Sequence, residues 1–328
     1  MRIAVDAVGG DYYPKNPVEG AIQAIEENDK IDILLCGPEG MIKKELSKFS
    51  YDDNRISIFD APQIIGMNES PAKAFKTKPD SSIVRGLTVQ KKGQCDAFIS
   101  AGNTGALLAA STFILGKLEG VIRPTIAALY PTIKGFRLLV DAGANLEVKP
   151  EMLYQFGLMG KVYVEEVLGI ENARIGLLNV GEEKEKGTEI LKESYNLLDK
   201  NPNFIGNIEG RDILPAKADV FVCDGMIGNI TLKFGESLVD AFQILISQGI
   251  EKNKLSDEQK QVVLKVISDV ISPFDYQMVG GVPFLGVDGI SLVGHGSSSA
   301  KAVKNMILNA ALCVEHGVNS KIVSSLKN

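Results

Sequence analysis

The sequence predicts a three-layer α/β/α fold built on a mostly parallel, Rossmann-like sheet. Short apolar runs typical of strands alternate with helical segments along most of the chain. Several strands end in turns rich in glycine, asparagine and aspartate, as is common in open α/β sheets. With 328 residues, of which 45% are hydrophobic and 23% charged, the chain can bury a large core without a disulfide or a metal.

The first half of the chain shows the alternation most clearly. A strand over residues 2–5 precedes a helix for which Asn16 is the expected cap, Pro17 the first helical residue and Glu19 the partner in a capping box. The remaining expected elements of this half are strands at 33–36, 56–59 and 97–100, and helices at 39–48, 82–92 and 104–115.

The second half continues the pattern, with more helix. Two strands in close succession are expected at 125–129 and 136–140, followed by a helix at 150–168. Further strands are expected at 175–179, 204–207, 220–223 and 291–293, and further helices at 187–198, about 230–271 and about 298–316. We expect one continuous domain over residues 1–328, with an appended helical pair at about 245–275.

Composition excludes several classes of function. The net charge of −6, the absence of tryptophan and an aromatic content of 6% argue against a nucleic-acid partner. Residues 97–116 carry no charge, but a membrane span there would expose the turn at 102–105 to lipid. Four widely spaced cysteines without metal-ligand spacing are typical of buried, reduced thiols in a cytoplasmic protein.

Six polar turns follow predicted strands, and we expect them to meet at one edge of the sheet. Glycine lets backbone N–H groups approach an anion, and a helix N-terminus adds partial positive charge. The set therefore predicts a site that handles phosphate, with the turn at 100–105 as the best anion cradle. The candidate residues in the turns are Asp6, Gly9, Gly10, Asp11, Ser100, Gly102, Asn103, Thr104, Gly105, Asp141, Asn145, Gly181, Glu183, Asp224, Gly225, Gly228, Gly296 and Ser297.

Common catalytic motifs are absent from the sequence. It has no GxxxxGK[ST] loop, no GxGxxG followed by an acid and no GxSxG elbow, which weakens the ATPase, dinucleotide-binding and serine-hydrolase interpretations. No metal site and no cofactor is expected.

A few single residues are candidates for chemistry. His295 lies between two glycines and is either a site residue or a turn residue, whereas the helix dipole explains His316 at a helix end. Lys186 and Lys233 are either site cations or solvated surface charges.

Together these motifs resemble the acyl-carrier-protein:phosphate acyltransferases, the PlsX family, over nearly the whole chain. The stretches that carry the resemblance are residues 6–11, 81–82, 100–106, 123–124, 141–145, 149–150, 176–181, 186–187, 204–207, 209–212, 224–225, 228–229, 231–233 and 295–298. Asn207 and Glu209 join the candidate binding residues on this ground. Lys76 stands where the family usually has arginine, and the tip at 251–258 is more polar than a membrane-touching tip would be.

The resemblance implies a homodimeric fold related to phosphotransacetylases and isocitrate-dehydrogenase-like enzymes. It implies transfer of a long acyl chain from acyl carrier protein to inorganic phosphate, giving acyl phosphate for phospholipid synthesis. A membrane glycerol-3-phosphate acyltransferase would use that product. The expected location is the cytoplasm, with peripheral contact at the inner membrane face left open.

For this reaction we expect direct attack of phosphate on a thioester. Lys186 would neutralise phosphate or the developing oxyanion, with Asn179 and Asn229 as neutral donors. His295 would protonate the leaving thiolate, and Asp6, Asp11, Asp141 and Asp224 would order the donors. An acidic carrier also needs a local basic patch, either Lys73, Lys76 and Lys78 or Lys252, Lys254, Lys260 and Lys265.

Two other functions fit parts of the sequence. A short-chain acyl-CoA:phosphate acyltransferase would share the architecture and differ in its donor. A non-catalytic scaffold at the membrane surface would use the helical pair, but it would leave the six polar turns unexplained.

Overall fold

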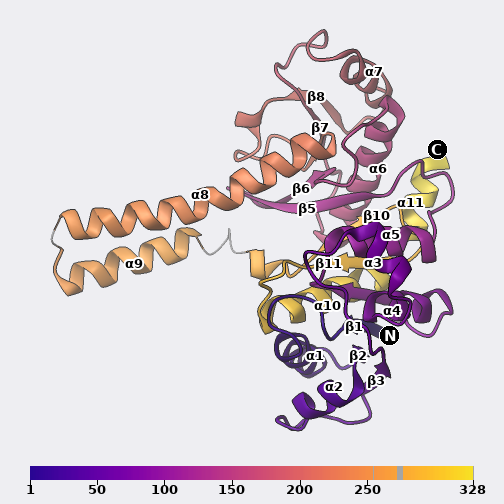
Figure 1. Cartoon of the computed structure of the whole chain (residues 1–328). Helices are drawn as coiled ribbons and strands as arrows, with labels where there is room; N and C mark the ends of the chain where they lie inside the picture. Colours follow the sequence, from indigo (N-terminus) through magenta and orange to yellow (C-terminus); the bar gives the residue numbers. More distant parts are fainter. Residues whose placement is uncertain (254, 272–275, 328) are drawn as a thin grey trace.

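A computed structural model describes residues 1–253, 255–271 and 276–327, and its centre is an 11-stranded sheet (Figure 1). The strands follow the order β3-β2-β1-β4-β11-β10-β5-β6-β9-β7-β8 across the sheet. They are β1 (Arg2–Asp6), β2 (Asp32–Gly37), β3 (Ile56–Asp60), β4 (Ala97–Ser100), β5 (Thr125–Thr132), β6 (Gly135–Val140), β7 (Ile175–Leu178), β8 (Phe204–Ile208), β9 (Val220–Val222), β10 (Val282–Leu285) and β11 (Ile290–Val293). Most neighbouring strands in the described chain are parallel, which confirms the predicted fold class.

Helices connect most of the strands. They are α1 (Lys15–Glu27), α2 (Glu39–Leu46), α3 (Pro71–Thr77), α4 (Ser82–Lys91), α5 (Thr104–Ile114), α6 (Pro150–Val167), α7 (Glu189–Leu198), α8 (Gly225–Lys252), α9 (Asp257–Ile271), α10 (Ala300–Glu315) and α11 (Val318–Lys327), with short 3-10 turns η1 (Gly210–Asp212) and η3 (Tyr276–Met278). The four cysteines are buried thiols, as expected.

The strands are apolar on both sides because helices cover both faces of the sheet. In β1, Ile3 and Val5 pack toward α1 and α10, whereas Ala4 between them packs toward α4 and α5. Helices α6 and α11 extend the first layer over β6, β9 and β7, and the first turns of α8 extend the second layer over β5 and β6. The described chain therefore has the three predicted layers.

Strand direction reverses in the middle of the sheet. β11 is parallel to β4 and β1, but the β10–β11, β10–β5 and β5–β6 pairs are all antiparallel. Three reversals leave β6, and with it β9, β7 and β8, running opposite to β1, β4 and β11. The carboxyl ends of the two blocks therefore lie at opposite edges, and the expectation that all six polar turns share one edge is wrong.

Some local expectations also differ from the structure. Helix α1 begins at Lys15 after Pro14, without a side-chain cap, and the Asn16 amide instead donates to the Ser298 carbonyl at 2.9 Å. The predicted capping box is therefore absent because Asn16 is already inside the helix. Helix α8 begins at Gly225, earlier than expected, because the Asp224 carboxylate caps it by accepting the Ile227 N–H. Helix α3, strand β10 and helix α11 were not predicted.

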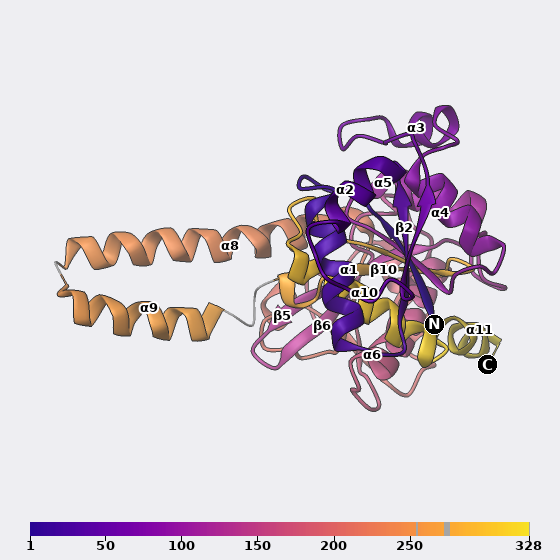
Figure 2. The same ribbon diagram turned by 90° about the horizontal axis from the view of Figure 1, so that it is seen from below.

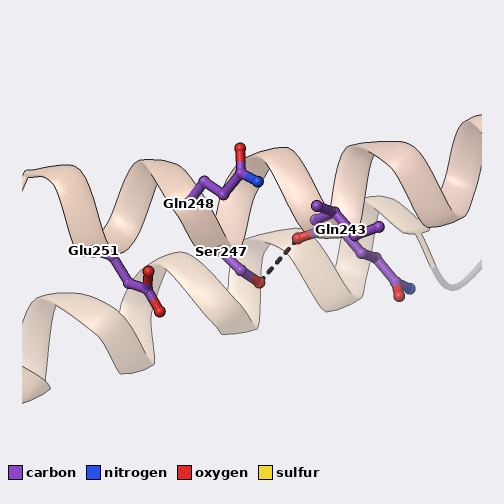
Figure 3. A pocket seen from close by; sticks show the side chains of 5 residues that line it. Gln243, Ser247, Gln248 and Glu251 are labelled. Atoms are coloured by element: carbon purple, nitrogen blue, oxygen red, sulfur yellow. Dashed lines mark hydrogen bonds between the residues drawn. The ribbon is translucent and has the colours of Figure 1, made fainter.

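Helices α8 and α9 form an arm that reaches away from the sheet (Figures 1 and 2). Only the start of α8 packs on the sheet, and the remainder lies beside α9. A polar hollow of about 490 Å³ on the arm is lined by α8 residues, including Gln243, Ser247 and Glu251 (Figure 3). None of the predicted site residues lines it. No described helix combines the length and the apolar character that a membrane crossing needs.

The packing of α4 on β4 predicts the effect of a single methyl group. A Cβ at Gly86 would lie 2.1 Å from Cε2 of Phe98, which is fully buried. We therefore expect Gly86→Ala to lower the free energy of unfolding by about 2 kcal/mol, as overpacking a core does. Urea unfolding followed by circular dichroism measures this. Gly40→Ala in α2 is the control, because a Cβ there has nothing within 4 Å. Equal losses in both variants would contradict this packing.

Candidate active site

The turns after β1, β4 and β11 form one compact group, which we call the first turn group (residues 6–11, 100–105 and 294–298). The Ser100 hydroxyl donates to the Asp6 carboxylate at 2.6 Å, and the Gly102 N–H donates to the Ser100 hydroxyl at 2.9 Å. The Asp11 N–H donates to the Gly296 carbonyl at 2.7 Å. These bonds tie the three turns to one another.

Gly9 and Gly10 allow this close approach. A Cβ at Gly9 would lie 2.9 Å from the Gly102 nitrogen, and Gly10 has a φ of +91° with the Gly296 carbonyl 2.9 Å from its Cβ position. Both glycines are therefore needed for packing between turns.

Asn103 is occupied by the protein itself. Its Oδ1 caps α5 by accepting the Ala106 N–H at 3.0 Å. Its Nδ2 lies 3.0–3.3 Å from the carbonyls of Gly66, Met67 and Glu69, so the side chain holds the segment before α3 over the turn. The groups of this turn left to meet an anion are the exposed Thr104 side chain and the first N–H groups of α5.

His295 also lies in the first turn group. It is exposed, and its Nδ1 lies 2.7 Å from the Ser297 hydroxyl and accepts the Ser297 N–H at 3.2 Å. This bonding fixes the ring at the carboxyl end of β11.

The turns after β6, β9 and β7 form the second turn group (residues 141–145, 179–187 and 224–229), at the opposite edge. Asp141 is fully buried, and its oxygens accept the N–H groups of Ile126, Gly143, Ala144 and Asn145 and the Asn145 amide at 2.6–3.2 Å. This carboxylate is therefore a structural anchor that has no place for a substrate.

Helix α8 is pressed onto that anchor. The Gly225 N–H donates to the Asn145 carbonyl at 2.8 Å, and a Cβ at Gly228 would lie 1.8 Å from the Asp141 carbonyl oxygen. Asn229 follows on the exposed side of the helix, beside Gly143. The N-terminus of α8, with its partial positive charge, is thus fixed next to Asn229.

The loop after β7 carries Lys186. The Asn179 side chain donates to the Lys186 carbonyl at 3.0 Å and accepts the Val180 N–H at 2.8 Å. Asn207 donates to the Glu183 carbonyl at 2.9 Å and supports the same loop from β8. Asn179 and Asn207 therefore shape the loop, while the exposed Lys186 ammonium has no hydrogen bond or ion pair in the described part of the chain.

Other predicted site residues have structural partners. Glu209 caps η1 and pairs with Arg211 at 2.8 Å, and Lys233 pairs with Glu236 on α8 at 2.7 Å. Gly181 lies against Glu183 and Lys186 within their loop. The structure thus brings Lys186, Asn179 and Asn229 to one edge, and Asp6, Thr104, His295 and Ser297 to the other.

Exposed apolar side chains around the second turn group were missed by the sequence interpretation. They are Leu146, Val180, Met226, Ile227 and Ile230, each between 45% and 81% exposed. Each of these side chains lies in or beside a polar turn. An interpretation that considered only the polar residues of the turns did not include them. The signal was present as the apolar residues that directly follow Asn145, Asn179 and Gly225.

Comparison with known proteins identifies the family. The model of a family described as "Fatty acid synthesis protein", which is the PlsX family, matches residues 1–321. The chain belongs to this family. It is 45% identical to a protein named Phosphate acyltransferase from Chlorobaculum parvum, with 99% of each chain covered. A Phosphate acyltransferase from Halothermothrix orenii is 42% identical, with 100% of this chain and 98% of that protein covered. The chain is accordingly an acyltransferase enzyme, as its motifs predicted.

Solved structures confirm the fold class alone. The EutD phosphotransacetylase from Staphylococcus aureus superposes with a TM-score of 0.64 at 12% identity, covering 96% of this chain and 94% of that one. A phosphotransacetylase from Streptococcus pyogenes gives 0.61 at 16% identity, with the same coverage. The predicted relation to phosphotransacetylases thus holds at the level of fold.

The buried carboxyl of Asp6 predicts a pH dependence of stability. Burial raises its pKa, against the opposing effect of bonds from Ser100, Ser82 and the Val8 N–H. The native state therefore holds the proton more tightly than the unfolded state, and this contribution to stability is present at low pH and is lost as the pH rises through the raised pKa. Asp6→Asn keeps an acceptor oxygen but removes the charge, so its free energy of unfolding should rise relative to wild type as the pH increases above about 4.

Urea unfolding at a series of pH values between 4 and 8 would measure that difference. Asp53→Asn, which removes an exposed carboxylate, controls for the loss of one negative charge. Parallel pH profiles for wild type and Asp6→Asn would contradict a tightly held proton on Asp6.

Proposed function

We propose that this acyltransferase moves a long acyl chain from acyl carrier protein to inorganic phosphate, forming acyl phosphate for phospholipid synthesis. One observation carries the proposal. The second turn group presents the Lys186 ammonium and the Asn229 amide without partners in the described chain, at the same edge of the sheet as the fixed N-terminus of α8. A phosphate dianion requires such a cation, neutral donors and a helix N-terminus.

The apolar rim of the same group supports an acyl substrate. Leu146, Val180 and Ile230 expose apolar surface to water next to the polar turns. A fatty acyl chain would cover that surface while its thioester carbonyl lies over the donors. A short acyl group would leave most of the rim exposed, so the rim favours the long-chain donor over the short-chain alternative.

In the proposed reaction, a phosphate oxygen attacks the thioester carbonyl carbon, and the carbon–sulfur bond breaks as the tetrahedral intermediate collapses. Lys186 balances the charge of phosphate and oxyanion, and Asn229 donates a hydrogen bond. A thiolate is a good leaving group because a thiol pKa is only about 8.5, so no strong acid is needed. His295 and the turn at 100–105, which the sequence predicts as the proton donor and the anion cradle, take no part in this step, because within one chain both lie at the other edge of the sheet.

Removal of the exposed Lys186 ammonium should lower the rate of acyl transfer without changing the fold. We expect Lys186→Ala to lower kcat/KM for acyl phosphate formation by about 10²–10³, since it removes the cation that stabilises developing charge. Acyl phosphate formed from acyl carrier protein and phosphate is the product to measure. Lys184→Ala is the matched control, because Lys184 lies two residues away but pairs with Asp199 and the Tyr195 ring. Unchanged turnover in Lys186→Ala, or a covalent acyl-protein adduct, would contradict the mechanism.

The arm supports the proposed homodimer. Along α8 and α9, Phe234, Phe242, Leu245, Val262, Val266 and Val270 are each more than half exposed. That much apolar surface on a two-helix arm is typical of a helix pair that packs against a further partner. A second copy would cover it, and cytoplasmic acyl phosphate could then pass to a membrane glycerol-3-phosphate acyltransferase at the inner membrane face.

Charged residues on this surface should break the dimer. We expect Phe242→Glu with Leu245→Glu to convert a dimer to a monomer, because buried carboxylates would repel the second copy. Light scattering after size-exclusion chromatography measures the mass. Gln243→Glu with Gln248→Glu, on the polar hollow of the same helix, is the control that should remain dimeric. A wild-type monomer would contradict the homodimer.

A further inference from the structure

Helices α3 and α5 form a face without any acidic residue. Residues 71–79 contain three lysines and no acid, and residues 101–118 contain one lysine and no acid, in a chain with a net charge of −6. The hydrophobic clusters place both helices on the same side of the sheet, and Figure 2 shows α3 outside α5. The molecule therefore has a locally basic face within an acidic whole.

The lysines of this face differ in availability. Lys78 is held by Glu69 and the Ile64 carbonyl, and Lys117 donates to the Ile122 carbonyl at 2.9 Å. Lys73 and Lys76 are exposed, and their ammonium groups have no partner in the described chain. These two cations can meet an acidic partner without breaking an existing ion pair.

An aromatic pair lies beside them. Phe75 of α3 stacks on Phe113 of α5 with ring centroids 5.3 Å apart, yet Phe113 remains 72% exposed. A large exposed ring flanked by unpaired lysines is typical of an interface, where an aromatic anchor is buried and charges align around it.

The face is fixed to the first turn group. A Cβ at Gly105 would lie 2.6 Å from Cγ of Pro71, the first residue of α3, and the Asn103 amide holds the segment before it. From there α5 runs to the opposite edge, where the Leu118 N–H after it donates to the Gly286 carbonyl at 3.0 Å and β5 begins beside Asp141. A partner centred on Phe113, in the last turn of α5, would thus sit toward the edge that holds the second turn group.

The other basic candidate from the sequence is weaker. On the arm, Lys260 pairs with Asp257 at 3.3 Å, and Lys252 directly follows Glu251, while Lys254 lies outside the described residues. Alternating charges there give little net attraction for an acidic partner. A second copy of this chain is also a poor occupant of the α3–α5 face, because two identical basic faces would repel each other.

We propose that the α3–α5 face, with Lys73, Lys76 and Phe113 at its centre, is the docking surface for the acidic carrier protein that delivers the acyl thioester. This inference rests on the proposed function for the identity of the donor. The lysines steer and orient the carrier, and the exposed ring is buried when it docks.

Charge reversal at the two lysines tests the docking surface. Lys73→Glu with Lys76→Glu should raise the apparent KM for acyl carrier protein by about tenfold, more at low salt, with kcat unchanged. Transfer from acyl-pantetheine, a thioester without a carrier protein, should keep its rate. Lys252→Glu with Lys265→Glu on the arm is the matched control and should leave the KM unaltered. An unchanged KM in the α3–α5 variant, or a loss confined to its binding of anionic phospholipid vesicles, would overturn the proposal.

Failure of the proposed function can be distinguished from failure of the proposed docking surface. If the wild type forms no acyl phosphate from either donor, fluorescence titration with labelled acyl carrier protein still decides the docking question. Weaker binding by Lys73→Glu with Lys76→Glu, but not by the arm variant, would support the surface. Equal binding by all three proteins would reject it.

Discussion

The antiparallel pairing of β10 with β11 and β5, and of β5 with β6, determines where every functional group of this enzyme can lie. A sheet that ran parallel throughout would bring all the polar turns to one edge. Here the reversal places the N-terminus of α5 at one edge and that of α8 at the other, although both helices cover the same face of the sheet. Their positive ends therefore cannot act on one bound anion within a single chain.

Two buried carboxylates hold these helix N-termini in place by different means. Asp141 accepts four backbone N–H groups and one amide, and charge-assisted bonds of this kind are stronger than neutral ones. Asp6 has hydroxyl partners and one backbone N–H, and burial dominates, so its pKa is raised. Four aspartates near a phosphate site would repel the ligand if they were exposed to it. Three of the four carboxylates instead have partners within the protein: Asp6 and Asp141 are buried, and Asp224 caps α8.

Local patterns were sufficient to predict most of the elements. The apolar run at Ala97–Ser100 and the helix that follows Asn103 stand where their periodicity places them. The missing elements have weak local signals. Helix α3 is a seven-residue helix held by Asn103 from another turn, and β10 is a four-residue strand whose pairing with β5 joins residues far apart in the sequence. β10 is antiparallel to both β11 and β5, so these two reversals cancel, and the antiparallel β5–β6 pair is what turns the second block of strands around. Both strands of that pair were predicted, but the effect of their reversal on the later turns was not.

Residue type predicts where a site lies better than it predicts which polar atoms of the site remain free to bind a ligand. Asn103 and Asn179 follow strands in polar turns and Asn229 lies in the first turns of α8, yet the amides of the first two are bonded to the backbone and the third is left exposed. Whether an amide is bonded depends on which loop lies against it in the folded protein, and the spacing of residues in the sequence does not predict this. Lys184 and Lys186 differ in the same way, since only Lys184 meets Asp199 and Tyr195.

The net charge of −6 conflicts with acidic substrates only if charge is averaged over the whole surface. At physiological ionic strength, exposed charges act over about 8 Å, so a docking partner responds to the side chains beneath it and to little else. The segments 71–79 and 101–118 contain no acid. Lys186 has no partner in the described chain, although the exposed Glu183 and Glu185 lie in the same loop. The overall excess of acid works against an acidic carrier, so docking depends on a local face such as α3–α5, where Lys73 and Lys76 lie on a helix without acidic residues.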